Sequence, residues 1–191
     1  MPQVLKESVR KNIREAAAVV FYEKNYISAT MKEIAERAGI PVGLVYSYYK
    51  NKASLFDDVV EPAYASFTGS IEKEERWQKS PAENFRNMGL EPLLELLREH
   101  RRLVILTDKS QGTRHEHAKE ELIGALENHI RTGLNSHSKE RFDETLVHIL
   151  ASNFTESLLE IARHYKNEKW AEKMLELVVQ CYFHGVGSLF G

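Results

Sequence analysis

Residues 30–49 constrain the fold of this chain more than any other segment. The four residues that start at Thr30 have the pattern of a capping box, in which the Thr30 hydroxyl and the Glu33 carboxylate each accept a hydrogen bond from the other residue's amide. Gly39 follows the helix, and glycine readily adopts the left-handed conformation that ends one. Pro41 then suits the first position of a second helix. The segment therefore predicts helix, tight turn, helix, the unit that places its second helix in the major groove of DNA.

The residues on either side of this unit also have a helical pattern. An apolar stripe from Val9 to Val20 predicts a helix that ends near Lys24. After the second helix of the unit, Asn51 is suited to cap another helix that begins at Lys52 or one residue later. The N-terminal part of the chain is therefore predicted to be a small domain of three helices, with a fourth leading away from it.

Apolar residues keep a helical spacing through the rest of the chain, and no segment alternates as a half-buried strand does. Pro62 is expected to kink or end the fourth helix, Ser80 to begin a later one, and Pro92 to mark a bend. Two long helices follow, with apolar stripes over 142–165 and 170–189. We expect an all-α protein with a helix-turn-helix domain over 1–52 and a larger helical bundle over 53–191.

Composition indicates an ordinary soluble globular protein. With 191 residues, 42% hydrophobic and 28% charged, the chain is long enough to bury a core without support from a metal or a disulfide. The single cysteine, Cys181, excludes an intramolecular disulfide and is too few for a structural zinc site. The first 17 residues are charged throughout, unlike a signal peptide, and no 18-residue apolar run is present. We expect a cytoplasmic protein.

Charge is distributed unevenly along the chain. Residues 1–56 hold nine Lys and Arg against five Glu, an excess of four positive charges, whereas the whole chain has a net charge of −2. The remaining residues therefore have a net charge of −6. A basic N-terminal part on an acidic body is typical of a DNA-binding domain joined to a domain with another role.

Residues 35–55, AERAGIPVGLVYSYYKNKASL, resemble the signature of the TetR family of bacterial transcriptional regulators. With Phe21 and the helix start at Thr30, the resemblance covers roughly residues 8–57. It implies a transcriptional regulator, and specifically a repressor, whose N-terminal domain binds DNA. The larger domain then serves for ligand binding and dimerisation.

The resemblance assigns DNA contacts to individual residues. Pro41, Val42 and Leu44 would face base edges. Tyr46 and Ser47 would contact the sugar-phosphate backbone, and Lys52, at the start of the fourth helix, would bind phosphate. Apolar residues cannot make the bidentate hydrogen bonds that separate guanine from adenine, so they would pack against thymine methyl groups. Tyr48 is expected to pack in the core with Val45, and Thr30 is also an adequate helix cap without DNA. The predicted DNA-binding residues are Thr30, Lys32, Pro41, Val42, Leu44, Tyr46, Ser47 and Lys52.

The resemblance further implies a homodimer, formed by the last two helices, on a palindromic DNA operator. The predicted dimer interface consists of Leu146, Ile149, Leu150, Leu158, Leu175, Val178, Tyr182 and Phe183. An unidentified small-molecule effector would bind between the middle helices and change the spacing of the two DNA-binding domains. The predicted effector-binding residues are Phe67, Trp77, Phe85, Met88, Leu97, His100, Leu103, Asp108 and Phe154.

Other classes of function find less support in the residues. No two of the eight histidines lie three or four residues apart, so the sequence predicts no metal and no other cofactor. The chain has no phosphate-binding glycine loop, no GxSxG elbow and no obvious pair of carboxylates, so we expect it not to be an enzyme. A helical protein-interaction module with degenerate DNA binding remains the alternative, because Pro41 and Val42 are unusual residues for reading bases.

Overall fold

The computed structural model describes residues 6–74, 90–137 and 142–187. Within these ranges the chain forms helices and no strands, which confirms the predicted all-α class. The chain divides into two compact units. The N-terminal unit contains residues 1–64 and 101–117, and the C-terminal unit contains residues 65–100 and 118–191.

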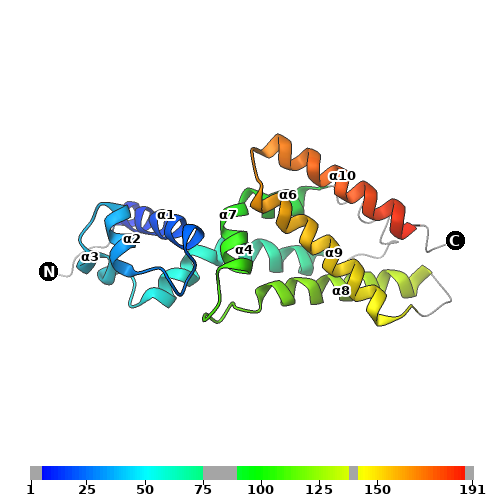
Figure 1. The fold of residues 1–191 in the computed structure, drawn as a ribbon, viewed down its shortest axis with the longest axis horizontal. Coiled ribbons are helices and arrows are strands. Elements are labelled where there is room, and N and C mark those ends of the chain that lie inside the picture. Colours follow the sequence, from blue (N-terminus) through cyan, green and yellow to red (C-terminus); the bar gives the residue numbers. More distant parts are fainter. Residues whose placement is uncertain (1–5, 75–89, 138–141, 188–191) are drawn as a thin grey trace. The chain divides into compact units, whose positions relative to one another are not determined.

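The N-terminal unit is built around one longer helix, two short ones and the beginning of a fourth (Figure 1). The buried side of the first helix packs against the second, and the second contacts the third. Helix α1 spans Glu7–Glu23, α2 spans Met31–Ala38, α3 spans Val42–Tyr48, α4 spans Lys52–Glu74, and α7 spans His100–Asp108.

Aromatic rings fill the core of the N-terminal unit. Phe21 of α1 and Phe56 of α4 are fully buried, and their rings meet edge to face with centroids 5.0 Å apart. The ring of Tyr26 lies 5.2 Å from Phe56 in the same kind of contact. Because large aromatic side chains bury much apolar surface, this cluster holds α1 to α4 and fixes the loop before α2.

The boundary of the N-terminal unit differs from the prediction of residues 1–52. Val59 and Val60, further along α4, are fully buried in this unit. A separate segment also joins the unit, since the Tyr26 amide donates to the Lys109 carbonyl at 2.9 Å and Asp57 lies 3.0 Å from the ring of His115. These contacts link residues far apart in the chain, so a pattern of local capping and spacing could not reveal them.

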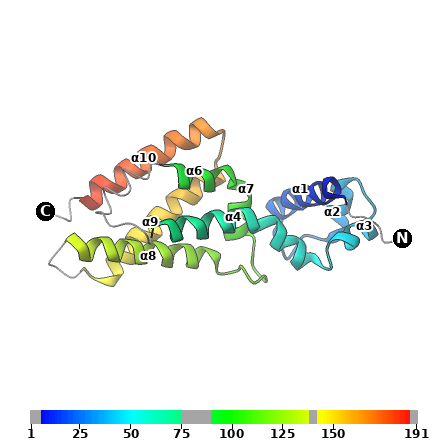
Figure 2. The same cartoon turned by 180° about the vertical axis from the view of Figure 1, so that it is seen from behind.

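The C-terminal unit contains three long helices, α8, α9 and α10, and the short helix α6 (Figures 1 and 2). Helix α9 contacts both α8 and α10, and α10 also contacts α6. The core includes Leu97, Leu159 and Leu175, each at most 1% exposed. Helix α6 spans Glu91–Arg98, α8 spans Ala118–His137, α9 spans Glu144–Arg163, and α10 spans Glu168–Gly187.

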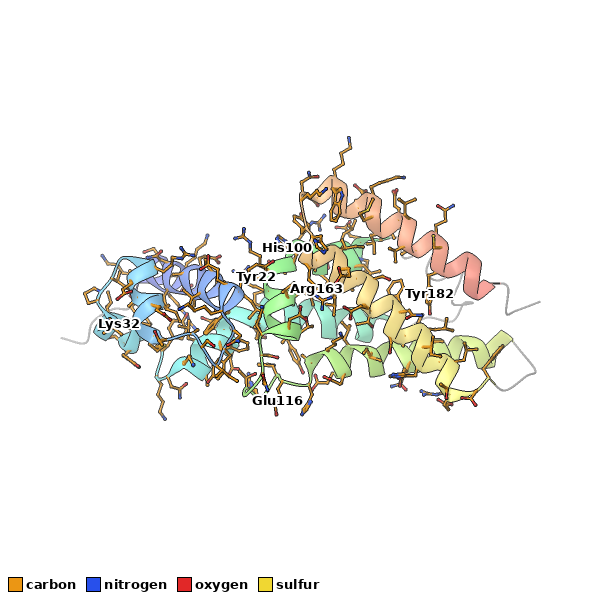
Figure 3. The ribbon with its side chains drawn as sticks, viewed as in Figure 1. Tyr22, Lys32, His100, Glu116, Arg163 and Tyr182 are labelled. Carbon is orange, nitrogen blue, oxygen red and sulfur yellow. The ribbon has the colours of Figure 1, made fainter. Side chains whose placement is uncertain are left out.

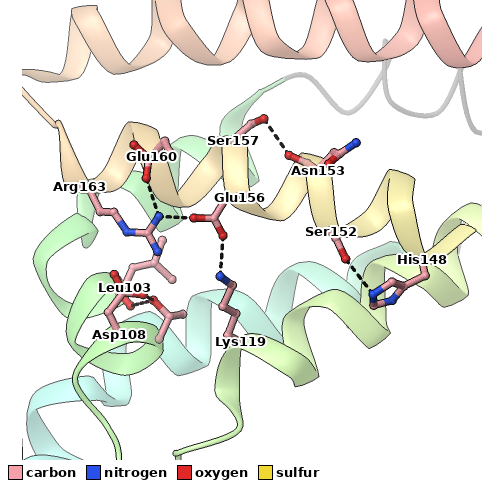
Figure 4. Close-up of polar contacts among 11 residues, drawn as sticks. Leu103, Asp108, Lys119, His148, Ser152, Asn153, Glu156, Ser157, Glu160 and Arg163 are labelled. Carbon is pink, nitrogen blue, oxygen red and sulfur yellow. Dashed lines mark hydrogen bonds and ion pairs between the residues drawn. The ribbon is translucent and has the colours of Figure 1, made fainter. Parts of the chain in front are cut away.

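An ion-pair network joins α8 to α9 within the C-terminal unit (Figure 4). The Lys119 ammonium lies 2.6 Å from Glu156, and Arg163 pairs with both Glu156 and Glu160. Hydrogen bonds from Lys119 and then from Arg163 lower the pKa of Glu156. The network therefore holds Glu156 in its charged form and fixes the register of the two helices.

Two predicted helix signals have different outcomes. Helix α4 continues through Pro62, which contradicts the predicted end there and leaves the alternative, a kink, as a prediction. Burial of Val59, Val60 and Ala63 around the proline offsets the hydrogen bond that its missing N–H removes. Pro92 lies in the first turn of α6, in agreement with the expected break before it, whereas the start predicted at Ser80 lies outside the described residues.

Among the described helices, none combines the length and apolar character needed to cross a membrane.

Candidate nucleic-acid interface

Local capping sets the helix-turn-helix geometry. The Glu33 amide donates to the Thr30 hydroxyl at 3.2 Å, and the Thr30 amide donates to the Glu33 carboxylate at 3.1 Å, so the predicted capping box is present. Gly39 has φ 67° and ψ 31°, the left-handed conformation that glycine adopts at little cost. The Ile40 amide then donates to the Ala35 carbonyl at 3.1 Å and closes the end of α2.

Helix α3 has one buried side and one open side. Val45 is fully buried, and Leu44 and Tyr48 are half-buried on the same side. The opposite side is exposed, and we call it the α3 face. It consists of Pro41, Val42, Gly43, Tyr46 and Ser47.

The α3 face presents apolar surface with few polar groups. The side chains of Val42 and Tyr46 are 40% and 52% exposed, unusually high values for large hydrophobic residues in this protein. The Ser47 hydroxyl donates to the Gly43 carbonyl at 3.1 Å, so its proton is already engaged. The α3 face therefore offers mainly apolar surface, with the Tyr46 hydroxyl as its other polar side-chain group.

A polar cluster fixes the end of α3 to α1 and α4. The Tyr49 hydroxyl donates to the Asp58 carboxylate, which also lies 3.2 Å from Nε of Arg10 and 3.7 Å from Arg14. Burial, and then the bond to Asp58, raises the pKa of Tyr49 to about 12. Burial alone would raise the pKa of Asp58, but the Tyr49 bond and the charges of Arg10 and Arg14 outweigh it and lower that pKa.

This cluster leads to a pH prediction. Because the folded-state pKa of Asp58 is lowered, its stabilising contribution is present above its unfolded pKa, about 3.9, and is lost as the pH falls through the lower folded value. Below about pH 4, the free energy of unfolding measured in urea should therefore fall more steeply with decreasing pH for the wild type than for Asp58→Asn. Equal pH slopes in the two proteins would contradict the assigned ion pairs.

The tyrosine that enters the core is Tyr49 rather than Tyr48. Tyr49 is 3% exposed, whereas Tyr48 is half-buried and its hydroxyl accepts from the Lys6 amide at 2.9 Å. The expectation that Tyr48 packs in the core with Val45 is therefore wrong in part. Tyr49 follows the last residue of α3, where the backbone becomes extended and turns its side chain inward.

Lys52 has a structural role that the sequence did not indicate. Its ammonium donates to the carbonyls of Tyr26 at 2.6 Å, Ala29 at 2.9 Å and Ile27 at 3.3 Å. It also lies 4.4 Å from the centre of the Tyr26 ring. Since an ammonium has three protons, these carbonyls engage all of its donors. This geometry does not support the predicted direct contact of Lys52 with phosphate; it makes Lys52 a clamp on the loop between α1 and α2.

Thr30 is likewise engaged within the fold. Its hydroxyl donates to Glu33 at 3.0 Å and accepts from the Glu33 amide, so both functions of the hydroxyl serve the cap. Hydrogen bonds from Lys24 and then from Thr30 lower the pKa of Glu33. A charged carboxylate at this helix end repels a phosphate, so the geometry favours the capping role of Thr30 over direct DNA binding.

Two lysines in the elements next to α3 remain accessible. The Lys32 side chain on α2 is 80% exposed, with only a loose ion pair to Glu36 at 3.9 Å (Figure 3). Lys50 is exposed in the short turn after α3, three residues beyond Ser47. Lys50 is not among the predicted site residues, although its position between the two helices could have indicated it. Either cation is free to approach a phosphate without breaking a strong ion pair.

The predicted dimer residues divide between surface and core. Leu158 and Leu175 are buried within a single protomer, so they belong to the core and not to an accessible interface. Ile149 is 47% exposed, and Leu177, which was not predicted, is 42% exposed.

The remaining predicted dimer residues are less accessible than Ile149. Leu150 and Tyr182 pack on the cluster of Ile130, Val147 and Ala151, and the Tyr182 ring meets Phe154 at 5.0 Å. Leu146 and Val178 are half-buried, and the side chain of Phe183 lies outside the described residues.

The predicted effector residues do not form one described site. Trp77, Phe85, Met88 and the side chain of Phe67 lie outside the described residues. Leu97 and Phe154 are core residues of the C-terminal unit, where His100 stacks on Tyr165 with centroids 3.9 Å apart. Leu103 is buried in the N-terminal unit, and Asp108 is exposed there at the end of α7. The effector site stays a prediction.

Comparison with known proteins places the helix-turn-helix in a family. Residues 13–59 match the model of the bacterial regulatory proteins of the tetR family, which are regulators and not enzymes, as the sequence predicted. The uncharacterized HTH-type transcriptional regulator YxbF of Bacillus subtilis is 28% identical over 95 residues, which are 50% of this chain and 25% of that protein. The matched segment thus spans about a quarter of that relative's length.

Solved structures resemble the chain over nearly its whole length. MexZ of Pseudomonas aeruginosa, described as a key repressor responsible for antibiotic resistance, is 22% identical with a TM-score of 0.61, covering 93% of this chain and 96% of its own. A TetR-like transcriptional regulator from Rhodococcus sp. RHA1 is 17% identical with a TM-score of 0.64, covering 97% and 99%. At these identities the likeness establishes the fold.

Proposed function

Since this chain is a member of the tetR family by its helix-turn-helix, we propose that it is a sequence-specific DNA-binding transcriptional regulator that acts as a repressor. The observation that carries the proposal is the α3 face, an exposed helix surface held in place by the Gly39 turn and the Tyr49–Asp58 cluster. A helix in this position of a helix-turn-helix enters the major groove. Lys32 and Lys50 lie in the adjoining helix and turn, where cations suit phosphate contacts.

Selection from random-sequence duplexes tests this function. The wild type should enrich one palindromic sequence whose half-sites lie about one helical turn, or a multiple of it, apart, because a twofold protein binds a twofold site. Protection of that sequence upstream of a gene, with higher transcript levels when the protein is absent, would support repression. Failure to enrich any sequence would contradict the proposed function.

The repressor assignment draws support from the structural relatives. MexZ, whose fold the chain shares over nearly its whole length, is described as a repressor. We propose that a small-molecule effector, bound in the larger unit, releases the DNA, and that the protein works in the cytoplasm. A compound that raises the melting temperature of the protein and also lowers its affinity for the selected duplex would identify the effector.

We propose that the protein acts as a homodimer through the exposed apolar side chains of α9 and α10. Ile149 and Leu177 each present more than 40% of their surface to solvent in one protomer. Isolated apolar residues are common on surfaces, but two on the predicted dimerisation helices are consistent with a twofold interface. A dimer would also supply the second α3 that a palindromic operator needs.

The double substitution Ile149→Glu and Leu177→Glu should yield folded monomers. Each substitution loses about 1.5 kcal/mol of binding free energy per buried side chain, and it occurs twice because the interface is twofold. The dissociation constant of the dimer should therefore rise about a hundredfold for each substitution. Light scattering after size-exclusion chromatography measures the mass. Ile27→Glu, the same change at a 59% exposed residue of the N-terminal unit, is the matched control and should stay dimeric. A double variant that remains dimeric would exclude this interface.

A protein-interaction module is the second candidate function. The apolar exposure of Val42 and Tyr46 favours it, because the same surface would suit the apolar patch of a protein. The two candidates differ in their response to salt. Binding of duplex DNA should fall steeply as salt rises, whereas binding through an apolar protein patch should change little.

A further inference from the structure

The chain between α7 and α8, residues 109–117, forms no helix but has a defined shape (Figure 1). We call it the α7–α8 segment, and it belongs to the N-terminal unit. The Ser110 hydroxyl donates to the His115 carbonyl at 3.0 Å, and the Gly112 amide donates to the Glu116 carboxylate at 3.1 Å. Ser110 and His115 are buried, so the segment has an inner side that packs on the unit.

His115 joins the α7–α8 segment to α4. Its side chain is 8% exposed, and its Nε2 lies 3.0 Å from the Asp57 carboxylate. Because a carboxylate oxygen only accepts, this contact requires a proton on Nε2. Nε of Arg114 donates to the same carboxylate at 3.1 Å, and the His115 ring meets the Tyr64 ring at 5.5 Å, edge to face. Since buried polar groups need a partner, Asp57 sets the orientation of the imidazole.

The loop between α1 and α2 is the second contact of the α7–α8 segment. The Tyr26 amide donates to the Lys109 carbonyl at 2.9 Å. The Ile27 side chain lies beside Gly112, since a Cβ atom built at Gly112 would be 3.7 Å from it. Asn25, at the start of the loop, has φ 121°, a strained value for a residue with a side chain. A strained backbone persists only where its surroundings fix it, so this loop depends on its neighbours.

Both contacts lie next to groups that place the helix-turn-helix. Asp57 directly precedes Asp58 in α4. Asp58 binds Tyr49 and Arg10, and these bonds hold the end of α3. The loop between α1 and α2 leads into Thr30, the cap of α2. The α7–α8 segment therefore contacts both elements that set the positions of α2 and α3, although it lies far from them in the sequence.

We propose that His115 is a positioning residue for DNA binding. It holds the α7–α8 segment against α4 and the α1–α2 loop, and so keeps α2 and α3 in the geometry that fits the duplex. His115 is buried, so it acts through Asp57 and not by touching DNA. The inference rests on the proposed DNA-binding function and adds a distant part of the chain to it.

The physical basis is preorganisation. A helix-turn-helix that is already held in its binding geometry loses less freedom when it binds, and its affinity is higher for that reason. Such a coupling is reciprocal. If the docked α7–α8 segment raises the affinity for DNA, then bound DNA must stabilise the docked segment by the same factor.

Amide hydrogen exchange of the wild type tests the reciprocal effect. The probe is the duplex that the wild type selects from random sequences. With the duplex bound, peptides that cover residues 109–117 should exchange about fivefold more slowly. Peptides at the start of α9, where Asp143 accepts from the Thr145 amide at 2.7 Å, are the reference and should exchange as before. Unchanged exchange in 109–117, or equal slowing in both regions, would overturn the inference.

Asp57→Ala tests the link by substitution. It removes the carboxylate that holds His115 and Arg114. It also removes a negative charge, which by itself would favour binding to a polyanion. Its affinity for the selected duplex should nevertheless fall about tenfold, because both protomers lose the link. Fluorescence anisotropy measures the affinity at a temperature at which circular dichroism shows the variant folded, and an unchanged or higher affinity would overturn the inference.

Glu61→Ala is the matched control for Asp57→Ala. It makes the same change of charge at an exposed residue one turn further along α4. This variant should bind the selected duplex at least as tightly as the wild type. A loss of affinity equal to that of Asp57→Ala would show that the effect is not local to the link with His115, and would overturn the inference as well.

His115→Gln and His115→Leu separate positioning from stability. Only glutamine keeps a donor that can replace Nε2 opposite Asp57. Both variants should melt below the wild type, but His115→Gln should bind the selected duplex about threefold more tightly than His115→Leu, or better. Equal affinities would overturn the positioning role. If the wild type selects no duplex at all, the proposed function itself has failed, which is a different result.

Discussion

Replacing Lys52 by methionine should lower the free energy of unfolding by about 3 kcal/mol. The substitution keeps most of the apolar stem but leaves the carbonyls of Tyr26, Ile27 and Ala29 without the ammonium that binds all three. A buried or half-buried acceptor that loses a charged donor costs about 1–3 kcal/mol, and total stability is only about 5–15 kcal/mol. Urea unfolding followed by circular dichroism measures the loss.

Lys50→Met is the matched control for Lys52→Met. The same chemical change occurs two residues earlier, at an exposed side chain in the turn after α3. This variant should keep the stability of the wild type and bind DNA less tightly, with a salt dependence reduced by about one phosphate contact per protomer. If Lys52→Met were as stable as the wild type, Lys52 would not be a clamp and its predicted phosphate contact would regain support.

Replacing Tyr46 by alanine should weaken binding to the selected duplex about a hundredfold while the dimer remains intact. Tyr46 is 52% exposed and holds no part of the core, so its removal leaves the fold unchanged. A good contact at a DNA interface contributes about 1–3 kcal/mol, and the loss occurs in both half-sites. Fluorescence anisotropy measures the affinity, and size-exclusion chromatography confirms the dimer.

Tyr46→Phe separates the ring of Tyr46 from its hydroxyl. If the hydroxyl donates to a phosphate, this variant should lose part of the affinity that Tyr46→Ala loses. If only the ring contacts the DNA, it should bind as tightly as the wild type. An unchanged affinity in Tyr46→Ala would remove Tyr46 from the interface and move the docking surface away from the α3 face.

Local patterns predicted the helix-turn-helix because each of its signals is contained within a few neighbouring residues. The Thr30–Glu33 box requires only residues three apart, and Gly39 needs only its own freedom to adopt φ 67°. Asn51 accepts from the Ser54 amide at 2.8 Å, so the cap of α4 was predictable for the same reason. These contacts belong to the ends of helices and involve only residues that are close in the sequence.

Contacts between distant segments were not predictable in this way. Lys52 reaches carbonyls more than 20 residues away in the chain, and Asp57 meets His115 across 58 residues. The burial of Tyr49 instead of Tyr48 follows from the extended backbone after α3, which an uninterrupted helical pattern does not show. Leu158 and Leu175 are apolar and lie on the predicted dimerisation helices, but only the packing of their own protomer decides that they are core residues.

The most direct test of the central claim, that the α3 face binds duplex DNA, is an anisotropy titration at about 50 and about 200 mM salt. The probes are the duplex selected by the wild type and a scrambled duplex of equal length. We expect two protomers per site, a strong preference for the selected duplex at both salt concentrations, and loss of that preference in Tyr46→Ala. Weak binding to both duplexes that vanishes equally at the higher salt concentration would contradict it.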